Sequence, residues 1–455
     1  MNEKMTKVEA LIARSKAAQA QFAFATQEQA DAAARAICKV VYDNCETLGP
    51  MAAEESRMGS VQDKIAKCRN KSSQIWYSLK GKKSCDIINR IEERRMIEVA
   101  KPVGVVASII PSTNPVVTPM SNGAFALKCR CSVIFAPHPR AVKCTKLLVE
   151  LFRAELAKLG LPEDLVLGLE EVSNEVTAEL MSAADMIVAT GGMGMVKAAY
   201  SSGKPAIGVG QGNVQCIVDE DADLADAAGK IITGRSFDNG LICLGEQTVF
   251  VPEGKYDAFV DEMVKQGAYY VDDPADLNTL REGLFPEGGA FSRVVVGMYA
   301  DQVAKELGLP APEGTRVILA KASATGAGDV LCREKLCPVL SVMPYKTFKE
   351  GVAMMVENLE HEGKGHSICV HSNTPENVEY AAIQCAVSRV IVNQPSGTTG
   401  GGSPTNGFTP TTTLGCGTWG NNSFAGNLNY EQFLNITRVG YPLDESYLPD
   451  PDNVW

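Results

Sequence analysis

The loop around Cys243 carries the residue best suited to nucleophilic chemistry. It reads S-F-D-N-G-L-I-C-L-G-E-Q over residues 236–247 and lies between a helical stretch and a strand-like run. A thiol nucleophile needs exposure and nearby backbone N–H groups that stabilise negative charge, and a loop containing glycine and asparagine can provide both. Any one of the fourteen scattered cysteines is more often a buried structural thiol. The surrounding string, and not the residue type, therefore distinguishes Cys243.

A glycine-bearing turn is the second candidate. Residues 188–197 read V-A-T-G-G-M-G-M-V-K, so that a strand ends, glycines follow and a helix begins. This arrangement presents N–H groups and a helix N-terminus to a phosphate or a nicotinamide. The string does not match G-x-G-x-x-G, and a plain strand-to-helix turn explains the spacing equally well.

Two further loops each carry one polar candidate. Asn114 lies in I-I-P-S-T-N-P, after a buried strand, where its amide can donate to an oxyanion. Taken alone, an Asx-turn before Pro115 explains this asparagine better. Glu334 lies in R-E-K-L-C-P, and a lone glutamate in a loop is usually a solvated charge.

Alternating strands and helices must position these loops. Helices are expected over about residues 4–45, where T-Q-E-Q (26–29) has the form of a capping box. From Val103 short apolar runs alternate with helical stretches, and a second alternating series begins after Glu220. This pattern predicts an α/β fold with doubly wound parallel sheets. We expect two domains, 1–230 and 231–424, and a C-terminal segment, 425–455, whose strand pairs with another domain or subunit.

The composition excludes several classes of function. The chain has 455 residues, 45% of them hydrophobic, and a net charge of −11 with a pI of about 5.1. An acidic chain does not favour nucleic acid as a partner. No apolar run approaches the roughly 18 residues of a membrane helix, and no signal-peptide core is present, so we expect a cytoplasmic protein. No cysteine or histidine spacing suggests a metal site.

Taken together, the strings resemble the aldehyde dehydrogenase superfamily over nearly the whole chain. Further matching strings are E-E-S-R-M-G (54–59), F-A-P-H-P-R (135–140), H-E-G-K-G-H-S (361–367) and L-G-C-G-T-W-G (414–420). The similarity is greatest to the CoA-acylating branch, including the aldehyde dehydrogenase half of bifunctional aldehyde–alcohol dehydrogenases. The resemblance implies a Rossmann-type cofactor domain, an α/β catalytic domain with a nucleophilic cysteine, and a small β oligomerisation extension that forms a homodimer or homotetramer.

The resemblance also implies roles for individual residues. Cys243 matches the nucleophile, and Asn114 matches the side chain that holds the oxyanion. Glu334 matches a ribose-binding glutamate, whereas His366 lies near the active site or is a satisfied structural histidine. NAD is the expected cofactor, with NADP still open because Ala141 stands where many hydrolytic relatives have a glutamate. The implied cofactor-binding residues are Ser112, Thr113, His138, Pro139, Arg140, Thr190, Gly191, Gly192, Glu334 and His366.

One departure from the family bears on the acyl acceptor. Hydrolytic members have a glutamate in an E-L-G-G-K-like string, which activates water against the thioester. The corresponding string here is G-V-G-Q-G-N (208–213), where Gln211 cannot take a proton from water. Coenzyme A is therefore the expected acceptor. A hydrolytic aldehyde dehydrogenase, an inactive nucleotide-binding scaffold and a microcompartment enzyme are the alternatives.

The expected substrate is a small aldehyde. The segment T-T-G-G-G-S-P-T-N-G-F-T-P (398–410) lies where the family builds its aldehyde pocket, and it is rich in hydroxyl and amide groups. With Arg235 eight residues before Cys243, this lining suits a polar or anionic aldehyde such as sulfoacetaldehyde. Pairing of Arg235 with a surface acid is the other interpretation. Arg235, Thr399 and Gly400 are the predicted substrate-binding residues.

Overall fold

The computed structural model describes residues 5–444 and 450–453. Four helices open the chain. Threonine side chains cap the first two in capping boxes, so that the box expected at residues 26–29 is confirmed. The helices are α1 (Lys7–Phe22), α2 (Gln27–Asp43), α3 (Cys45–Ser56) and α4 (Val61–Leu79).

A five-stranded parallel sheet forms the centre of the first domain, in the order β5-β4-β3-β6-β7. One face packs on α2, α4, α5 and α6, and the other on α1, α7 and α8, because alternate side chains of each strand enter separate apolar cores. Chain order reverses between β3 and β6. The elements are β3 (Val105–Ile109), α5 (Val117–Lys128), β4 (Ser132–Ala136), α6 (Val142–Lys158), β5 (Val166–Gly168), α7 (Asn174–Ala183), β6 (Met186–Thr190), α8 (Met193–Tyr200) and β7 (Ala206–Val209).

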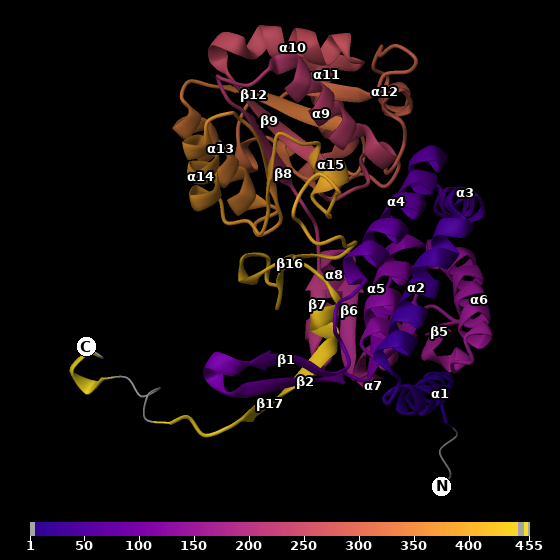
Figure 1. Cartoon of the computed structure of the whole chain (residues 1–455). Coiled ribbons are helices and arrows are strands. Elements are labelled where there is room, and N and C mark those ends of the chain that lie inside the picture. The colour runs from indigo at the N-terminus through magenta and orange to yellow at the C-terminus, as the bar shows by residue number, and fades with distance from the viewer. Residues whose placement is uncertain (1–4, 445–449, 454–455) are drawn as a thin grey trace.

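The second domain contains a seven-stranded parallel sheet in the order β10-β11-β12-β9-β8-β13-β14 (Figure 1). The predicted α/β class is therefore confirmed. The elements are β8 (Val214–Val218), α9 (Leu224–Ser236), β9 (Glu246–Pro252), α10 (Tyr256–Lys265), β10 (Ala268–Val271), α11 (Pro274–Leu284), α12 (Ala300–Leu307), β11 (Val317–Lys321), β12 (Val339–Tyr345), α13 (Phe348–His361), β13 (Ile368–His371), α14 (Pro375–Gln384), β14 (Val390–Val392) and α15 (Ser396–Thr399).

The sheet pairing bears on the domain boundary. Strand β8 precedes residue 230, yet it pairs with β9 and β13 of the second sheet. A boundary at residue 230 would cut this sheet, so we propose to divide the chain near residue 212. One apolar core on the first sheet is built from residues before position 212, and one on the second sheet is built from residues after it.

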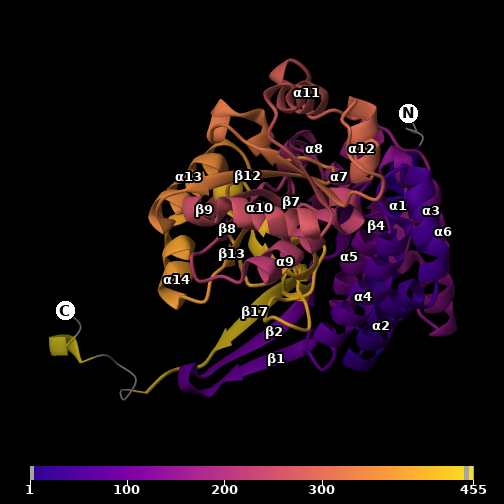
Figure 2. The same ribbon diagram turned by 90° about the horizontal axis from the view of Figure 1, so that it is seen from above.

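A three-stranded antiparallel arm projects from both domains (Figures 1 and 2). Its order is β1-β2-β17, so that the C-terminal strand pairs with a hairpin from the first quarter of the chain. The expected extension, residues 425–455, contributes β17 to this arm, and its residues 445–449 and 454–455 lie outside the described part. The strands are β1 (Asp86–Ile91), β2 (Met96–Pro102) and β17 (Leu434–Gly440), and a separate pair joins β15 (Leu414–Cys416) to β16 (Ala425–Asn427).

Among the described residues, no helix combines the length and the apolar character that crossing a membrane requires.

Candidate active site

The candidate site residues gather where the two parallel sheets face each other. Residues 210–213 alone join the end of β7 to the start of β8, so that the carboxyl edge of the first sheet adjoins the amino edge of the second. Asn114 and Thr190 follow or end strands of the first sheet. Cys243 and His366 precede strands of the second. The fold thus brings together loops that the sequence separates by more than a hundred residues.

The loop that carries Cys243 is held in an unusual backbone conformation. After α9 ends, Asp238, Asn239 and Gly240 have φ values of 49°, 55° and 71°. A Cβ at Gly240 would lie 2.6 Å from the carbonyl carbon of Cys337, so that this position requires glycine. Among the fourteen cysteines, all of which lie in the described ranges, every one except Cys243 is buried. Its partial exposure distinguishes it as the accessible thiol.

The electrostatic surroundings keep this thiol protonated. The pKa of Cys243 is raised to about 12, chiefly because the surrounding protein shields the sulfur from solvent; the neighbouring Glu334 and Cys416 contribute to the rise, and the Arg389 guanidinium opposes it. The thiolate is the nucleophilic form. Attack on a carbonyl therefore requires that the proton leave as the substrate binds.

Glu334 lies next to the Cys243 loop. Its Oε1 accepts a hydrogen bond from the Gly212 backbone N–H at 3.0 Å, and a Cβ at Gly212 would overlap the Cys243 carbonyl oxygen. Burial raises the pKa of Glu334 to about 8, with a further contribution from Glu362. Gln211 donates to the same Glu362 at 3.3 Å. The carboxyl group of Glu334 is thus largely neutral at pH 7.

Asn114 lies in the loop between β3 and α5. Its Oδ1 accepts a hydrogen bond from the Lys67 ammonium at 2.7 Å, and its Nδ2 lies 3.4 Å from the Thr113 hydroxyl. Lys67 also pairs with Asp238, on the loop that leads to Cys243. Sequence reasoning missed both residues. The sequence does offer a signal, because the two lysines of D-K-I-A-K (63–67) interrupt the apolar side of an amphipathic helix.

Eight of the ten predicted cofactor residues lie at the ends of three neighbouring strands. Ser112 and Thr113 follow β3, His138 to Arg140 follow β4, and Thr190 to Gly192 end β6 and begin α8. Loops at the carboxyl ends of parallel strands, beside the point where chain order reverses, form nucleotide sites in α/β folds. Thr190 Oγ1 is buried without a hydrogen-bond partner, and a Cβ at Gly192 would meet no atom. These features fit a dinucleotide at the turn.

His366 precedes β13 and is 1% exposed. Neither of its ring nitrogens has a hydrogen-bond partner, which does not favour the interpretation of a satisfied structural histidine. Burial and the nearby Arg389 guanidinium hold the pKa of His366 well below its usual value, so that the ring is neutral. Arg389 itself donates to the His366 and Gly415 carbonyl oxygens at 2.9 and 3.0 Å. Sequence reasoning did not identify Arg389.

The structure corrects the interpretation of Arg235. The side chain is 0% exposed, and its Nη2 donates to the carbonyl oxygens of Lys335, at 2.5 Å, and Cys337. It therefore neither reaches solvent nor pairs with a surface acid. Arg235 lies on the buried side of α9, where it fixes the loop that carries Glu334.

Thr399 and Gly400 lie close to the nucleophile loop. A Cβ at Gly400 would lie 2.8 Å from the side chain of Leu244, the neighbour of Cys243. The Lys71 ammonium donates to the carbonyl oxygens of Gly401 and Gly402 at 2.8 and 3.2 Å. Burial and the charge of Lys67 lower the pKa of Lys71 to about 8. Lys71 is thus a cation, absent from the sequence prediction, beside the predicted substrate segment.

Comparison with known proteins identifies the family. A profile of the aldehyde dehydrogenase family matches residues 2–280. The chain belongs to the aldehyde dehydrogenase family. It is 48% identical to the succinate-semialdehyde dehydrogenase (acetylating) of Clostridium kluyveri, over 98% of each chain, and 40% identical to the sulfoacetaldehyde dehydrogenase (acylating) of Bilophila wadsworthia, over 94% of this chain and 93% of that protein. The resemblance drawn from the sequence is confirmed.

Solved structures of the aldehyde dehydrogenase family extend this comparison. The propionaldehyde dehydrogenase of Rhodopseudomonas palustris, with bound propionyl-CoA, superposes with a TM-score of 0.86. It is 28% identical, over 95% of this chain and 94% of that chain. The acetylating aldehyde dehydrogenase of Geobacillus thermoglucosidasius superposes with a TM-score of 0.93 at 34% identity, over 98% of both chains.

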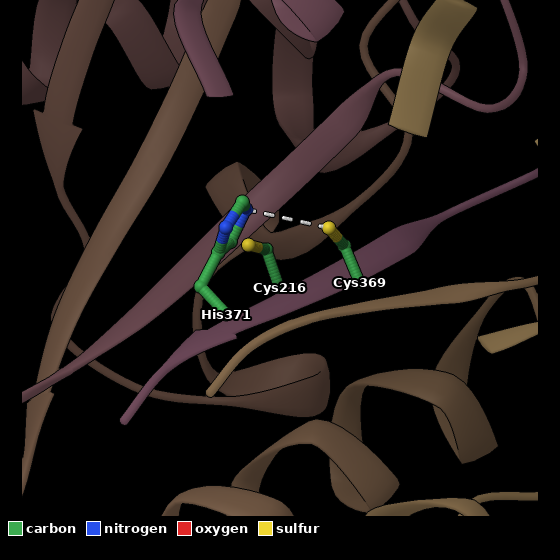
Figure 3. Close-up of side chains that lie close together, drawn as sticks. All are labelled: Cys216, Cys369 and His371. Atoms are coloured by element: carbon green, nitrogen blue, oxygen red, sulfur yellow. Dashed lines mark hydrogen bonds between the residues drawn. The ribbon is translucent and has the colours of Figure 1, made fainter. Parts of the chain in front are cut away.

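A group of thiols and a histidine lies elsewhere in this aldehyde dehydrogenase fold. Cys216 on β8 and Cys369 on β13 are register partners, and His371 points to the same side (Figure 3). Their ligand atoms lie within 4.8 Å of one another, and all three side chains are buried. Because the group lies along the strands and not at their amino ends, we assign it no step in the chemistry.

The charge of Glu334 leads to a pH-dependent prediction. Glu334→Gln keeps the acceptor for Gly212 but removes the charge that forms above about pH 8 and raises the pKa of Cys243. Alkylation of Cys243 by iodoacetamide should therefore be several-fold faster in the variant at pH 9 and equal to wild type at pH 6.5. Mass spectrometry of the Cys243 peptide measures the rate. Glu360→Gln on the surface of α13 is the control, and an equal ratio of rates at both pH values would contradict the prediction.

Proposed function

We propose that this chain is a CoA-acylating aldehyde dehydrogenase that uses a nicotinamide cofactor, with NAD favoured. One observation carries the acylating part of the proposal. Glu334 is the carboxyl group whose charge, within the described residues, acts on Cys243, and its pKa of about 8 keeps it largely neutral. With Gln211 where hydrolytic relatives have a carboxylate, neither Gln211 nor the largely neutral Glu334 supplies an anionic base that activates water. A thioester on Cys243 then persists until a thiol attacks it.

The residues of the site supply the remaining steps. The Cys243 thiolate attacks the aldehyde carbonyl carbon, and the resulting oxyanion receives hydrogen bonds from Asn114 Nδ2 and the Cys243 backbone N–H. When bound, the nicotinamide cofactor accepts the hydride that leaves the thiohemiacetal carbon. The turn from Thr190 to Gly192 and the Glu334 carboxyl group would hold it. The acyl group then remains on Cys243 as a thioester.

His366 is the candidate base for the acyl transfer. A neutral imidazole accepts a proton, and the two nitrogens of His366 lack partners inside the protein. In this proposal the imidazole takes the proton of the CoA thiol as its sulfur attacks the thioester carbon, and the Cys243 sulfur leaves. Each step is reversible, so that the same residues reduce an acyl-CoA.

The proposed substrate is a small aldehyde with an anionic group at its far end. The substrates that the names of the two relatives state, succinate semialdehyde and sulfoacetaldehyde, share this chemistry. A Cβ at Gly401 would lie 3.1 Å from Lys71 Nζ and 3.7 Å from the Leu244 side chain, so that a cation lies near the nucleophile loop. No carboxylate among the described residues pairs with Lys71. A substrate anion would compensate this buried charge.

Activity assays test the proposed reaction. NADH formation from succinate semialdehyde, sulfoacetaldehyde and propanal should require CoA, and Cys243→Ala should abolish it while the protein remains folded. Absorbance at the NADH band, with and without CoA, measures the outcome. Equal rates without CoA would favour the hydrolytic alternative, and no activity with NAD or NADP would favour the scaffold.

The role of Lys71 is tested by a change of specificity. Lys71→Met keeps the length of the side chain but removes the charge, so that KM for succinate semialdehyde should rise at least about tenfold while KM for butanal stays within about twofold. Steady-state kinetics with both aldehydes measures the ratio. Arg235→Lys is the control, because the Arg235 guanidinium binds main-chain carbonyl oxygens of Lys335 and Cys337 and its replacement should affect both substrates alike. A parallel change of both KM values in Lys71→Met would contradict the assignment.

We also propose that the arm joins copies of the chain into a homo-oligomer. Strand β17 pairs with β2 on one edge, and Val439 and Tyr441 are 37% and 51% exposed. An unpaired edge with apolar side chains is a surface for association. All fourteen cysteines are free thiols, which supports the expectation of a reducing, cytoplasmic compartment.

Light scattering after gel filtration tests the assembly. The full chain should have a mass that is a multiple of 48.6 kDa, and Tyr441→Asp should shift it toward the monomer without loss of helical signal. Glu431→Gln, an exposed residue just before β17, removes a charge without adding one and serves as the control. A monomeric wild type would contradict the proposal.

A further inference from the structure

Lys67 reaches two elements of the active site at once. Its ammonium donates a hydrogen bond to Asn114 Oδ1 at 2.7 Å and a second one to Asp238 Oδ2. The side chain comes from α4, it is buried, and Asp238 is 0% exposed. The helix α4 would form without this buried ion pair, so the contact between Lys67 and the oxyanion donor calls for another explanation.

Asp238 is bound from several sides. Its Oδ1 accepts the Ser60 backbone N–H at 3.0 Å, its Oδ2 also accepts the Lys64 ammonium at 3.1 Å, and its own N–H donates to Asp63 at 2.8 Å. Because both carboxylate oxygens of Asp238 have hydrogen-bond partners, its side chain is held in one position. Lys67 is consequently held in one position relative to the Cys243 loop.

The contact decides which way the Asn114 amide faces. An asparagine side chain has one acceptor oxygen and one NH2 donor, and an ammonium can only donate. The bond from Lys67 therefore fixes the oxygen toward α4 and turns Nδ2 away from it. We propose that Lys67, held by Asp238, is a positioning residue that orients the Asn114 amide as the oxyanion donor.

The same contact adds to the strength of that donor. A cation on Oδ1 polarises the amide, so that its N–H groups become better donors to a developing negative charge. It also ties together two loops from different domains, because Asn114 follows β3 and Asp238 lies five residues before Cys243. Nucleophile and oxyanion donor are then aligned before substrate binds. This inference rests on the proposed roles of Cys243 and Asn114.

The burst of p-nitrophenolate from p-nitrophenyl acetate isolates this step. The Cys243 sulfur bonds to the acetyl carbon, the ester C–O bond breaks, p-nitrophenolate leaves and the thiol proton passes to solvent. The tetrahedral intermediate carries the same oxyanion, yet the reaction needs neither aldehyde, cofactor nor CoA. Lys67→Met should slow the burst at least about tenfold, by analogy with the loss of an oxyanion donor. Alkylation of Cys243 by iodoacetamide, which forms no oxyanion, should stay within about twofold of wild type.

Lys64→Met provides a matched control. Lys64 is a buried lysine of the same helix and binds the same Asp238, but its other hydrogen bond, at 3.3 Å, goes to the Thr113 carbonyl oxygen and not to Asn114. Lys64→Met should lower the thermal stability as much as Lys67→Met does, whereas the rate of the burst should change less than about threefold. An equal loss of burst rate in the two variants would overturn the inference.

A double-mutant cycle separates positioning from general damage. If Lys67 acts through Asn114, then Lys67→Met should add nothing to the loss caused by Asn114→Ala. Asp238→Asn, which keeps the size of the side chain, should show the same lack of additivity and serves if Lys67→Met does not fold. Additive losses in both cycles would overturn the inference. A wild-type burst without CoA-dependent NADH formation would overturn the proposed function instead, and the cycle would still decide the role of Lys67.

Discussion

The last strand of the five-stranded sheet and the first strand of the seven-stranded sheet are joined by residues 210–213 alone. So short a link leaves the carboxyl edge of one sheet no position except against the amino edge of the other. Loops that close a dinucleotide site on one side therefore meet loops that carry a nucleophile on the other. The link itself lies at the candidate site. The Gly212 N–H donates to Glu334, and the Gly212 Cα lies against the Cys243 carbonyl.

Buried charge is the second constraint on this region. Arg235, Lys335 and Lys67 are all buried, and main-chain carbonyls or amide oxygens supply many of their partners. Desolvation of such groups costs stability, and because Nε and Nη1 of Arg235 have no hydrogen-bond partner, the two carbonyl contacts of its Nη2 are the ones that hold its loop. The loops they bind consequently have one well-defined arrangement. A site whose reacting atoms must align within a fraction of an ångström benefits from that rigidity.

Local sequence patterns predicted the parts of this molecule that depend on local chemistry. The α/β class follows from alternating apolar runs, whereas the roles proposed for Cys243 and Asn114 follow from the resemblance to the family, because local patterns alone favour a buried thiol and an Asx-turn. Local patterns do not predict contacts between segments that are distant in the sequence. Lys67 meets Asn114, and Asp238 meets α4, only because the sheets bring these residues together. Arg235 was misread because sequence distance from Cys243 does not say which side of α9 faces the core. The proposed boundary near residue 212 in place of 230 rests on contacts of the same kind, since the partners of β8, β9 and β13, come later in the chain.

The pairing of β17 with β2 has a consequence for biosynthesis. Phe433, at the start of this segment, packs against Phe125 with ring centroids 6.1 Å apart, and Leu428 enters the same core. The apolar face of the first domain is therefore completed by residues that the ribosome adds only after it has made the whole of the second domain. Domains usually fold as they emerge, but here the core beside α5 stays uncovered in a nascent chain until residues 428–433 have been made. A chaperone that shields this apolar surface would bind every nascent chain. A chain truncated before residue 428 would leave the surface permanently exposed and would be a substrate for degradation.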